Sequence, residues 1–117
     1  MRKLKKGKKF HRTTGERRAF LRNLSKELIK YGKIETTEAR AKAIRPIVEK
    51  LITVAKKQNL ASRRLLLSRI QSKTLVKKLY EEIGPKYEKR SGGYLKITKS
   101  GKFRKRDSAK MAKIEFV

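Results

Sequence analysis

The side chains that could do chemistry in this 117-residue chain are mostly lysines and arginines. There are 36 of them against 10 acidic residues, which gives a formal net charge of +26. A surface this cationic repels itself unless a polyanion lies nearby, and each phosphate that a basic side chain neutralises releases condensed counterions. Arginine can also grip a phosphate with two parallel hydrogen bonds, whereas lysine acts as a mobile point charge. The composition therefore predicts binding to a phosphate polymer.

The sequence lacks the combinations of residues that catalysis needs. His11 is the only histidine, and the absence of cysteine excludes thiolate zinc sites, disulfides and thiol catalysis. Glu81 and Glu82 are adjacent, but adjacent residues of a helix point about 100° apart and cannot share one substrate. Gly92-Gly93 is a lone glycine pair before a predicted strand, which is typical of a flexible turn. We therefore expect no enzyme, no cofactor and no metal site, and we interpret His11 as a stacking or phosphate-contacting group.

The excess charge is densest near the two ends of the chain. Residues 1–12 contain seven Lys or Arg and no acid, so alone they cannot bury enough apolar surface to offset the entropy of ordering. Residues 99–110 contain six basic residues and one acid. We expect a disordered basic arm at 1–12, one α/β domain at 13–117, and a basic loop before the last strand.

The elements that must position these charges begin with a helix after Thr13. Thr13 and Glu16 fit the pattern of a capping box, and Gly32 supplies the left-handed residue that ends helices. The apolar residues expected to face the core from this helix are Phe20, Leu24, Leu28 and Tyr31, with Leu21 beside them. Most of the helix's basic residues lie off this stripe, so the helix has one apolar and one basic face.

The rest of the chain predicts an α+β fold. The other expected elements are a strand at 33–37, a helix at 38–57 that Pro46 either kinks or divides, a short helix at 60–70, a helix capped by Ser72 and stopped by Gly84-Pro85, and strands at 94–98 and 111–116. The inward positions expected in the second helix are Ala39, Ala43, Ile47, Leu51, Val54 and Ala55, and those in the fourth are Leu75, Val76, Leu79, Tyr80 and Ile83. Alternation places Leu95, Ile97, Ile114 and Phe116 on one face of a sheet. We expect two layers in the order α-β-α-α-α-β-β, with helices packed on one face of a three-stranded mixed sheet.

Four segments carry a family resemblance. They are RRAFLRNL (17–24), KIETTEARAKAIRPIVEKLITVAK (33–56), EEIGPKYEKRSGGYLKI (81–97) and MAKIEF (111–116). In this order they resemble the bacterial L17 ribosomal protein family over nearly the whole chain. The resemblance implies a structural protein of the large ribosomal subunit in the cytoplasm, bound to 23S ribosomal RNA near the peptide exit tunnel beside other large-subunit proteins, and not a homo-oligomer.

The residues expected to contact RNA combine the basic segments with the positions that match the family. They are Arg2, Lys3, Lys5, Lys6, Lys8, Lys9, His11, Arg12, Arg17, Arg18, Arg22, Asn23, Arg63, Arg64, Arg90, Gly92, Gly93, Tyr94, Lys102, Arg104 and Lys105. We expect the helical face with Arg17, Arg18 and Arg22 to dock first, after which the arm threads between RNA helices and orders. The chain departs from the family at Arg106, where a glycine often precedes the aspartate, and at Lys110, where a proline is common.

Three other classes of protein fit the composition less well. A nucleoid-type DNA-binding protein predicts a dimer that presents a strand or helix to a groove, and no self-pairing heptad or β-arm pair is visible. A membrane-active cationic protein needs a basic helix with exposed bulky apolar residues, and no apolar run here is long enough to cross a bilayer. An RNA-processing enzyme needs a metal-binding carboxylate cluster. We therefore expect a soluble intracellular protein with no membrane partner and no small-molecule substrate.

Overall fold

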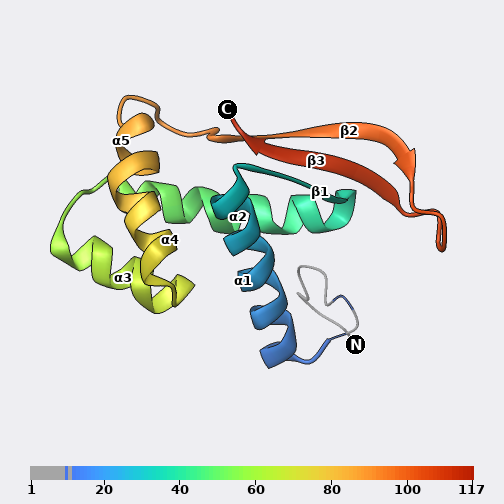
Figure 1. Cartoon of the computed structure of the whole chain (residues 1–117), viewed down its shortest axis with the longest axis horizontal. Coiled ribbons are helices and arrows are strands. Elements are labelled where there is room, and N and C mark those ends of the chain that lie inside the picture. The colour runs from blue at the N-terminus through green and yellow to red at the C-terminus, as the bar shows by residue number, and fades with distance from the viewer. Residues whose placement is uncertain (1–9, 11) are drawn as a thin grey trace, which may run out of the picture.

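The computed structural model describes Phe10 and residues 12–117 and has two layers (Figure 1). Its elements are α1 (Thr14–Tyr31), β1 (Lys33–Thr37), α2 (Glu38–Ala55), α3 (Leu60–Ile70), α4 (Lys73–Lys78), a π-helical segment (Leu79–Ile83), α5 (Gly84–Lys86), β2 (Leu95–Phe103) and β3 (Lys110–Phe116). The helices lie on one face of the three-stranded sheet, and α2 runs beneath it. The predicted α+β class and element order are confirmed. The predicted basic arm lies almost wholly outside the described residues.

The sheet is antiparallel throughout, so the expectation of a mixed sheet is wrong. The strand order is β1-β3-β2, and β3 pairs antiparallel with both neighbours. Strands β1 and β2 run in the same direction, so the sheet would be mixed only if those two strands were adjacent. Leu95 pairs with Phe116 and Ile97 with Ile114, which confirms their predicted common face. Strand β2 continues to Phe103, so the predicted loop at 99–110 shrinks to the hairpin tip at 104–109.

Helix α1 begins and ends where the sequence predicts. The Thr13 hydroxyl accepts a hydrogen bond from the Glu16 amide at 3.3 Å, and the Glu16 carboxylate accepts one from the Thr13 amide at 3.5 Å. Gly32 closes the helix with φ of +79°, and its amide donates to the carbonyl of Leu28. Tyr31, predicted to face the core, is 64% exposed. The buried stripe runs one step further round the helix, through Ser25 and Ile29.

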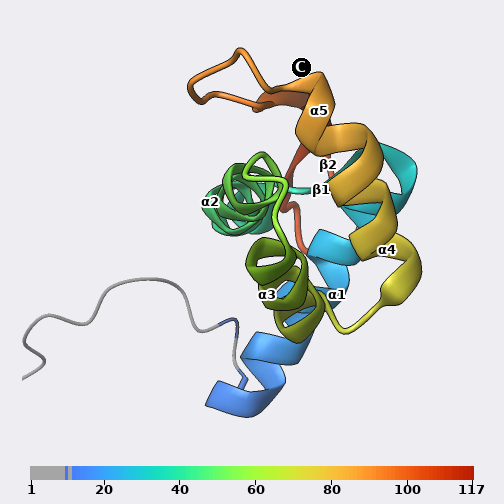
Figure 2. The ribbon, with the colours of Figure 1, turned by 90° about the vertical axis from the view of Figure 1, so that its left-hand side faces the viewer.

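Helix α2 is one continuous helix through Pro46, so the alternative that Pro46 starts a second segment is wrong. Its buried residues are Ala41, Ile44, Val48, Leu51, Ile52 and Ala55. The predicted Ala39, Ala43 and Ile47 are only half-buried. The reason is that α2 packs against the sheet as well as against α1 and α3, as Figure 2 shows in a view nearly along its axis. Most of its circumference is therefore apolar. The prediction of a narrow buried stripe was wrong for this helix.

The fourth helical region continues past Gly84-Pro85 to Lys86, so the expected stop there is wrong. A Cβ on Gly84 would lie 2.9 Å from the carbonyl oxygen of Ala55, so this glycine permits close packing against the end of α2 rather than ending a helix. The predicted inward positions Val76, Leu79 and Ile83 are buried. Leu75 and Tyr80, also predicted to point inward, are only half-buried.

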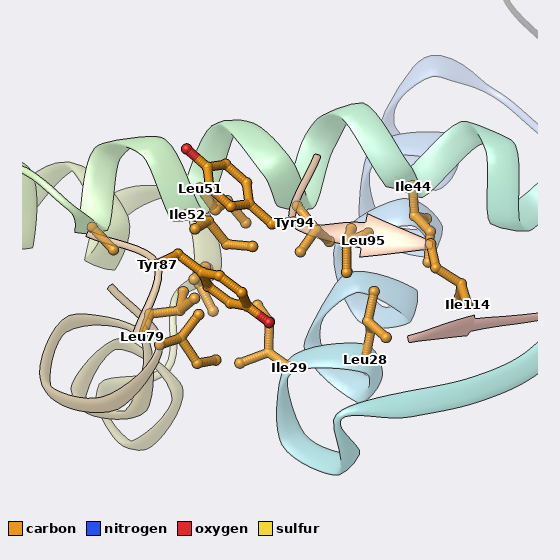
Figure 3. Packing of buried hydrophobic residues seen from close by; sticks show 14 of the residues in the cluster. Leu28, Ile29, Ile44, Leu51, Ile52, Leu79, Tyr87, Tyr94, Leu95 and Ile114 are labelled. Atoms are coloured by element: carbon orange, nitrogen blue, oxygen red, sulfur yellow. The ribbon is translucent and has the colours of Figure 1, made fainter. Parts of the chain in front are cut away.

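A single hydrophobic cluster joins the two layers (Figure 3). Leu28 and Ile29 enter it from α1, Ile52 from α2, and Ile114 from β3, all fully buried. Tyr87 and Tyr94 close one end, with ring centroids 5.3 Å apart. This core holds in place the helices and strands that carry the basic side chains on the surface.

Candidate nucleic-acid interface

The predicted contact residues of the described part lie in five places. Arg17, Arg18, Arg22 and Asn23 lie on α1; Arg63 and Arg64 on α3; Arg90, Gly92, Gly93 and Tyr94 in the connection from α5 to β2; and Lys102, Arg104 and Lys105 at the end of β2 and in the hairpin tip. Arg12 lies just before α1. Arg2, Lys3, Lys5, Lys6, Lys8, Lys9 and His11 lie outside the described residues.

A groove between α1, α2 and α3 has an apolar floor and a basic rim. Its volume is about 560 Å³. The floor includes Leu21, Ile29, Ile47, Leu51 and Ile70, and the basic residues that line it are Arg18, Arg22, Lys26, Lys50 and Arg69. Among the residues that the structure describes, none of those lining this groove is acidic. We name these five basic residues the groove rim.

The groove rim contains some residues that were expected to contact RNA and some that were not. Arg18 and Arg22 were expected, and Arg22 donates a hydrogen bond to the side-chain oxygen of Gln71 at 3.3 Å. Lys26 continues their row at intervals of four residues, a signal that the sequence did contain. Lys50 and Arg69 come from other helices, and only the tertiary fold brings them to the same rim.

A second basic group surrounds the ring of Phe20 on α1. The guanidinium carbon of Arg12 lies 3.9 Å from the ring centroid, and that of Arg40 lies 5.0 Å from it. The ring of Phe10 packs beside Phe20 at a centroid distance of 5.7 Å. We name Phe10, Arg12, Phe20 and Arg40 the Phe20 cluster. Sequence reasoning missed Arg40, because nothing in the first turn of α2 shows that this turn lies against α1.

A cleft of about 470 Å³ opens beside the Phe20 cluster. Its lining residues are Phe10, Thr37, Glu38, Ala39, Arg40, Lys42, Arg104, Ala109 and Lys110. Burial lowers the pKa of Arg40 below its usual value, the charges of Arg104 and Arg12 lower it further, and Asp107 opposes them. A hydrogen bond from Lys42 lowers the pKa of Glu38, whose carboxylate pairs with Lys42 at 3.0 Å and with Lys99 at 3.7 Å.

The hairpin tip at 104–109 is held by Asp107. Arg104 donates two hydrogen bonds to this carboxylate, one of them from Nε at 2.9 Å. The backbone closes around the pair, since the Ser108 amide donates to the Arg104 carbonyl at 2.8 Å. The bonds from Arg104 lower the pKa of Asp107 to about 2. The tip therefore has a defined shape, and it leaves Phe103 61% exposed beside Lys102.

Tyr94 is buried, so its ring is not available to stack on a base. It is 2% exposed, and its hydroxyl accepts a hydrogen bond from Lys56 Nζ at 2.9 Å. Lys56 also donates to the carbonyl of Arg90, and the Arg90 Nε donates to the carbonyl of Gly92 at 3.2 Å. The hydrogen bond from Lys56 lowers the pKa of Tyr94. Tyr94 thus fixes the turn at 90–93 that presents the neighbouring predicted residues.

The two arginines of α3 differ in their surroundings. The guanidinium carbon of Arg63 lies 5.3 Å from the ring centroid of Tyr80, and Arg64 is exposed. The same helix exposes Leu60, Leu65 and Leu67. This helix therefore presents both charge and apolar surface to the outside.

Within residues 10 and 12–117, no three His, Cys, Asp or Glu side chains are placed to hold a metal ion. None of the helices in that part combines the length and the apolar character needed to span a membrane.

Comparison with known proteins gives a consistent result. The family model described as Ribosomal protein L17 matches residues 20–117. Large ribosomal subunit protein bL17 of Persephonella marina is 51% identical over 118 residues, covering all of this chain and 95% of the relative. The bL17 proteins of Thermodesulfovibrio yellowstonii and Hydrogenobaculum are 49% and 48% identical, covering 95% and 100% of this chain and 83% and 99% of the relatives.

Proposed function

Since this chain belongs to the ribosomal protein L17 family, we propose that it binds 23S ribosomal RNA near the peptide exit tunnel of the large ribosomal subunit. Membership of the family makes the protein a structural component of the large subunit rather than an enzyme, and its place is the cytoplasm. The proposal adds the RNA contact, the position near the tunnel and neighbouring large-subunit proteins as further partners, and it does not include a homo-oligomer.

The groove rim is the observation that carries the RNA contact. Its five basic side chains come from α1, α2 and α3, and within the described part of the chain the residues lining the groove include no acid. Charges held on packed helices suit a phosphate backbone, because little ordering is needed on binding. If all five contact phosphates, they contribute a slope of about −4 to a plot of log K against log salt concentration.

Neighbouring proteins fit another part of the surface. Leu60, Leu65 and Leu67 leave apolar area exposed on α3, which is better covered by a protein than by a phosphate backbone. Arg63 and Arg64 lie between these leucines in the sequence. We therefore assign α3 to the border between RNA and a neighbouring protein.

The basic arm supplies a first test of the RNA contact. We divide the chain into an arm at 1–12 and one domain at 13–117, so deletion of residues 1–12 leaves a folded domain. The arm carries seven Lys or Arg, so its loss weakens binding to 23S transcripts by several kcal/mol and makes the salt slope shallower by about 5 to 6. Filter binding over a salt series measures both, and circular dichroism checks the fold. Unchanged affinity and slope would contradict this role.

Co-sedimentation tests the proposed place in the cell. The protein is followed by immunoblot through sucrose gradients of lysate, with and without a high-salt wash. A protein with many specific RNA contacts stays with the large subunit through about 0.5 M salt, whereas loosely bound polycations are released. Sedimentation with DNA, or release from ribosomes at modest salt, would contradict the proposal and favour a DNA-binding protein.

A further inference from the structure

We propose that the Phe20 cluster and Arg104 together form a binding site for one nucleotide of an RNA backbone, with its phosphate between Arg12, Arg40 and Arg104. The inference rests on the proposed RNA-binding function and deepens it by naming a single site. The three arginines come from the residue before the first turn of α1, the first turn of α2 and the hairpin tip.

Stacking on Phe20 leaves the binding edge of each arginine available. A guanidinium that rests its face on an aromatic ring keeps its N–H groups in the plane of the fork, where they can bind an anion. Arg12 uses one of these groups, since its Nη1 donates to the carbonyl of Phe10 at 2.8 Å. Within residues 10 and 12–117, the Arg40 guanidinium has no hydrogen-bond acceptor and no carboxylate within 4.0 Å. The ring thus holds donors in place without using them up.

The charges around Arg40 are arranged so that an anion would be stabilised there. Arg12 and Arg104 both act on Arg40 with like charge, and folding brings them together without placing a free acid among them. The two acids nearby already have partners in the described part, because Glu38 binds Lys42 and Asp107 binds Arg104. Asp107 occupies the Nε and Nη2 donors of Arg104 and offsets its charge in part, so Arg104 would contribute its remaining Nη1 donors to the phosphate. A phosphate would relieve the repulsion between the arginines.

The cleft is built for more than a lone ion. Its 470 Å³ lies within the range of about 300–1,000 Å³ that holds whole small molecules. Phe10, Ala39 and Ala109 add apolar wall beside the basic side chains, which suits the sugar or base attached to a phosphate. A nucleotide of an RNA chain therefore fits this site better than inorganic phosphate does.

The test compares two variants of one helix that remove the same charge. Arg40→Gln removes a cluster arginine, and Arg45→Gln removes an exposed arginine of α2 whose Nε pairs with Glu49 at 3.5 Å. Affinity for a 23S transcript is measured over a salt series. We expect Arg40→Gln to weaken binding about tenfold and to make the salt slope shallower by about 0.7 to 0.9, the effect of one phosphate contact. We expect Arg45→Gln to change affinity less than twofold.

Further measurements distinguish failure of this site from failure of the proposed function. Arg40→Lys keeps the charge and loses the planar fork, so its slope stays that of the wild type while its affinity falls about threefold. Equal effects of Arg40→Gln and Arg45→Gln would overturn the site. If the wild-type protein does not bind the transcript, the proposed function fails. Nitrogen-detected NMR of the arginine Nε groups with adenosine 5′-monophosphate then decides the site by itself: larger shifts at Arg40 than at Arg45 support it, and equal or absent shifts overturn it.

Discussion

The Phe20 cluster and the Tyr94 turn both place a cation over an aromatic ring, yet they leave that cation in different states. At Tyr94, Lys56 Nζ lies 5.1 Å from the ring centroid and donates to the Tyr94 hydroxyl and to the Arg90 carbonyl. At Phe20, Arg40 lies 5.0 Å from the ring centroid, and the ring has no polar atom to accept a hydrogen bond. The first arrangement satisfies its cation internally, and the second leaves donors for a ligand.

The difference shows that a cation near an aromatic ring does not by itself mark a binding surface. What decides is whether the donors of the cation already have acceptors within the fold. Tyr94 is buried and holds its turn closed, whereas Phe20 is half-buried and supports groups at the surface. Substitutions at Tyr94 should therefore change stability, and substitutions at Phe20 should change binding.

The largest expected effect is on stability at Tyr94. Tyr94→Ala removes a buried ring that packs on Tyr87, so the free energy of unfolding in urea should fall by about 3–5 kcal/mol. Tyr94→Phe is the matched control, because it loses only the hydroxyl and its hydrogen bonds, with an expected fall of about 1 kcal/mol. If Tyr94→Ala lowered the free energy of unfolding by less than about 1 kcal/mol, the ring would not be part of the core.

A smaller effect is expected on RNA affinity at Phe20. Phe20→Leu keeps the apolar bulk and removes the aromatic face on which Arg12 and Arg40 rest. Affinity for a 23S transcript should fall about tenfold, while stability changes by less than about 1.5 kcal/mol. The salt slope should stay the same, because no charge is lost. Phe20→Tyr retains a ring face and should bind like the wild type; wild-type affinity of Phe20→Leu would argue against the stacking.

The smallest expected effect is a pH-dependent loosening of the hairpin tip. Asp107 has a folded pKa of about 2, below its usual 3.8, because it accepts hydrogen bonds from Arg104. A depressed carboxyl pKa stabilises the tip above about pH 4, and this stabilisation is lost as the pH falls through about 2. The Ala109 amide, which donates to Asp107 at 3.3 Å, should report the change by NMR. Asp107→Asn should abolish the titration; a midpoint near 4 in the wild type would contradict the pairing.

Local signals in the sequence were sufficient for much of the fold. The capping box at Thr13 and Glu16 and the left-handed residue Gly32 are short-range patterns, and both are present as predicted. Alternation likewise placed Leu95 and Ile114 on one face of the sheet. Strand order was not predictable in the same way, because the pairing of β1 with β3 joins distant parts of the chain.

Long-range packing also explains what was missed elsewhere. Apolar residues surround much of α2, so periodicity alone could not choose Ile44 and Val48 over Ala43 and Ile47 as its buried positions. The role of Gly84 as a close contact with Ala55 has no local signature. A glycine before proline is more often a helix stop, which is why the helix was expected to end there.

The same reasoning explains why some residues of the candidate site could be predicted from the sequence and others could not. Arg18 and Arg22 were predictable because they share one face of a single amphipathic helix. Arg40 was not, because its importance comes from Phe20 on another helix and from Arg104 on the hairpin. Tyr94 was assigned to RNA because its segment with Arg90, Gly92 and Gly93 matches the family, and only the fold shows that it is buried.

The most direct test of the account compares one lost charge at each aromatic ring. Arg40→Gln and Lys56→Gln both remove one positive charge beside a ring, and the salt dependence of binding to a 23S transcript is measured for each. The account predicts that Arg40→Gln makes the slope of log K against log salt shallower by about 0.7 to 0.9, while Lys56→Gln leaves it unchanged. Equal slopes for the two variants, or a shallower slope for Lys56→Gln alone, would contradict it.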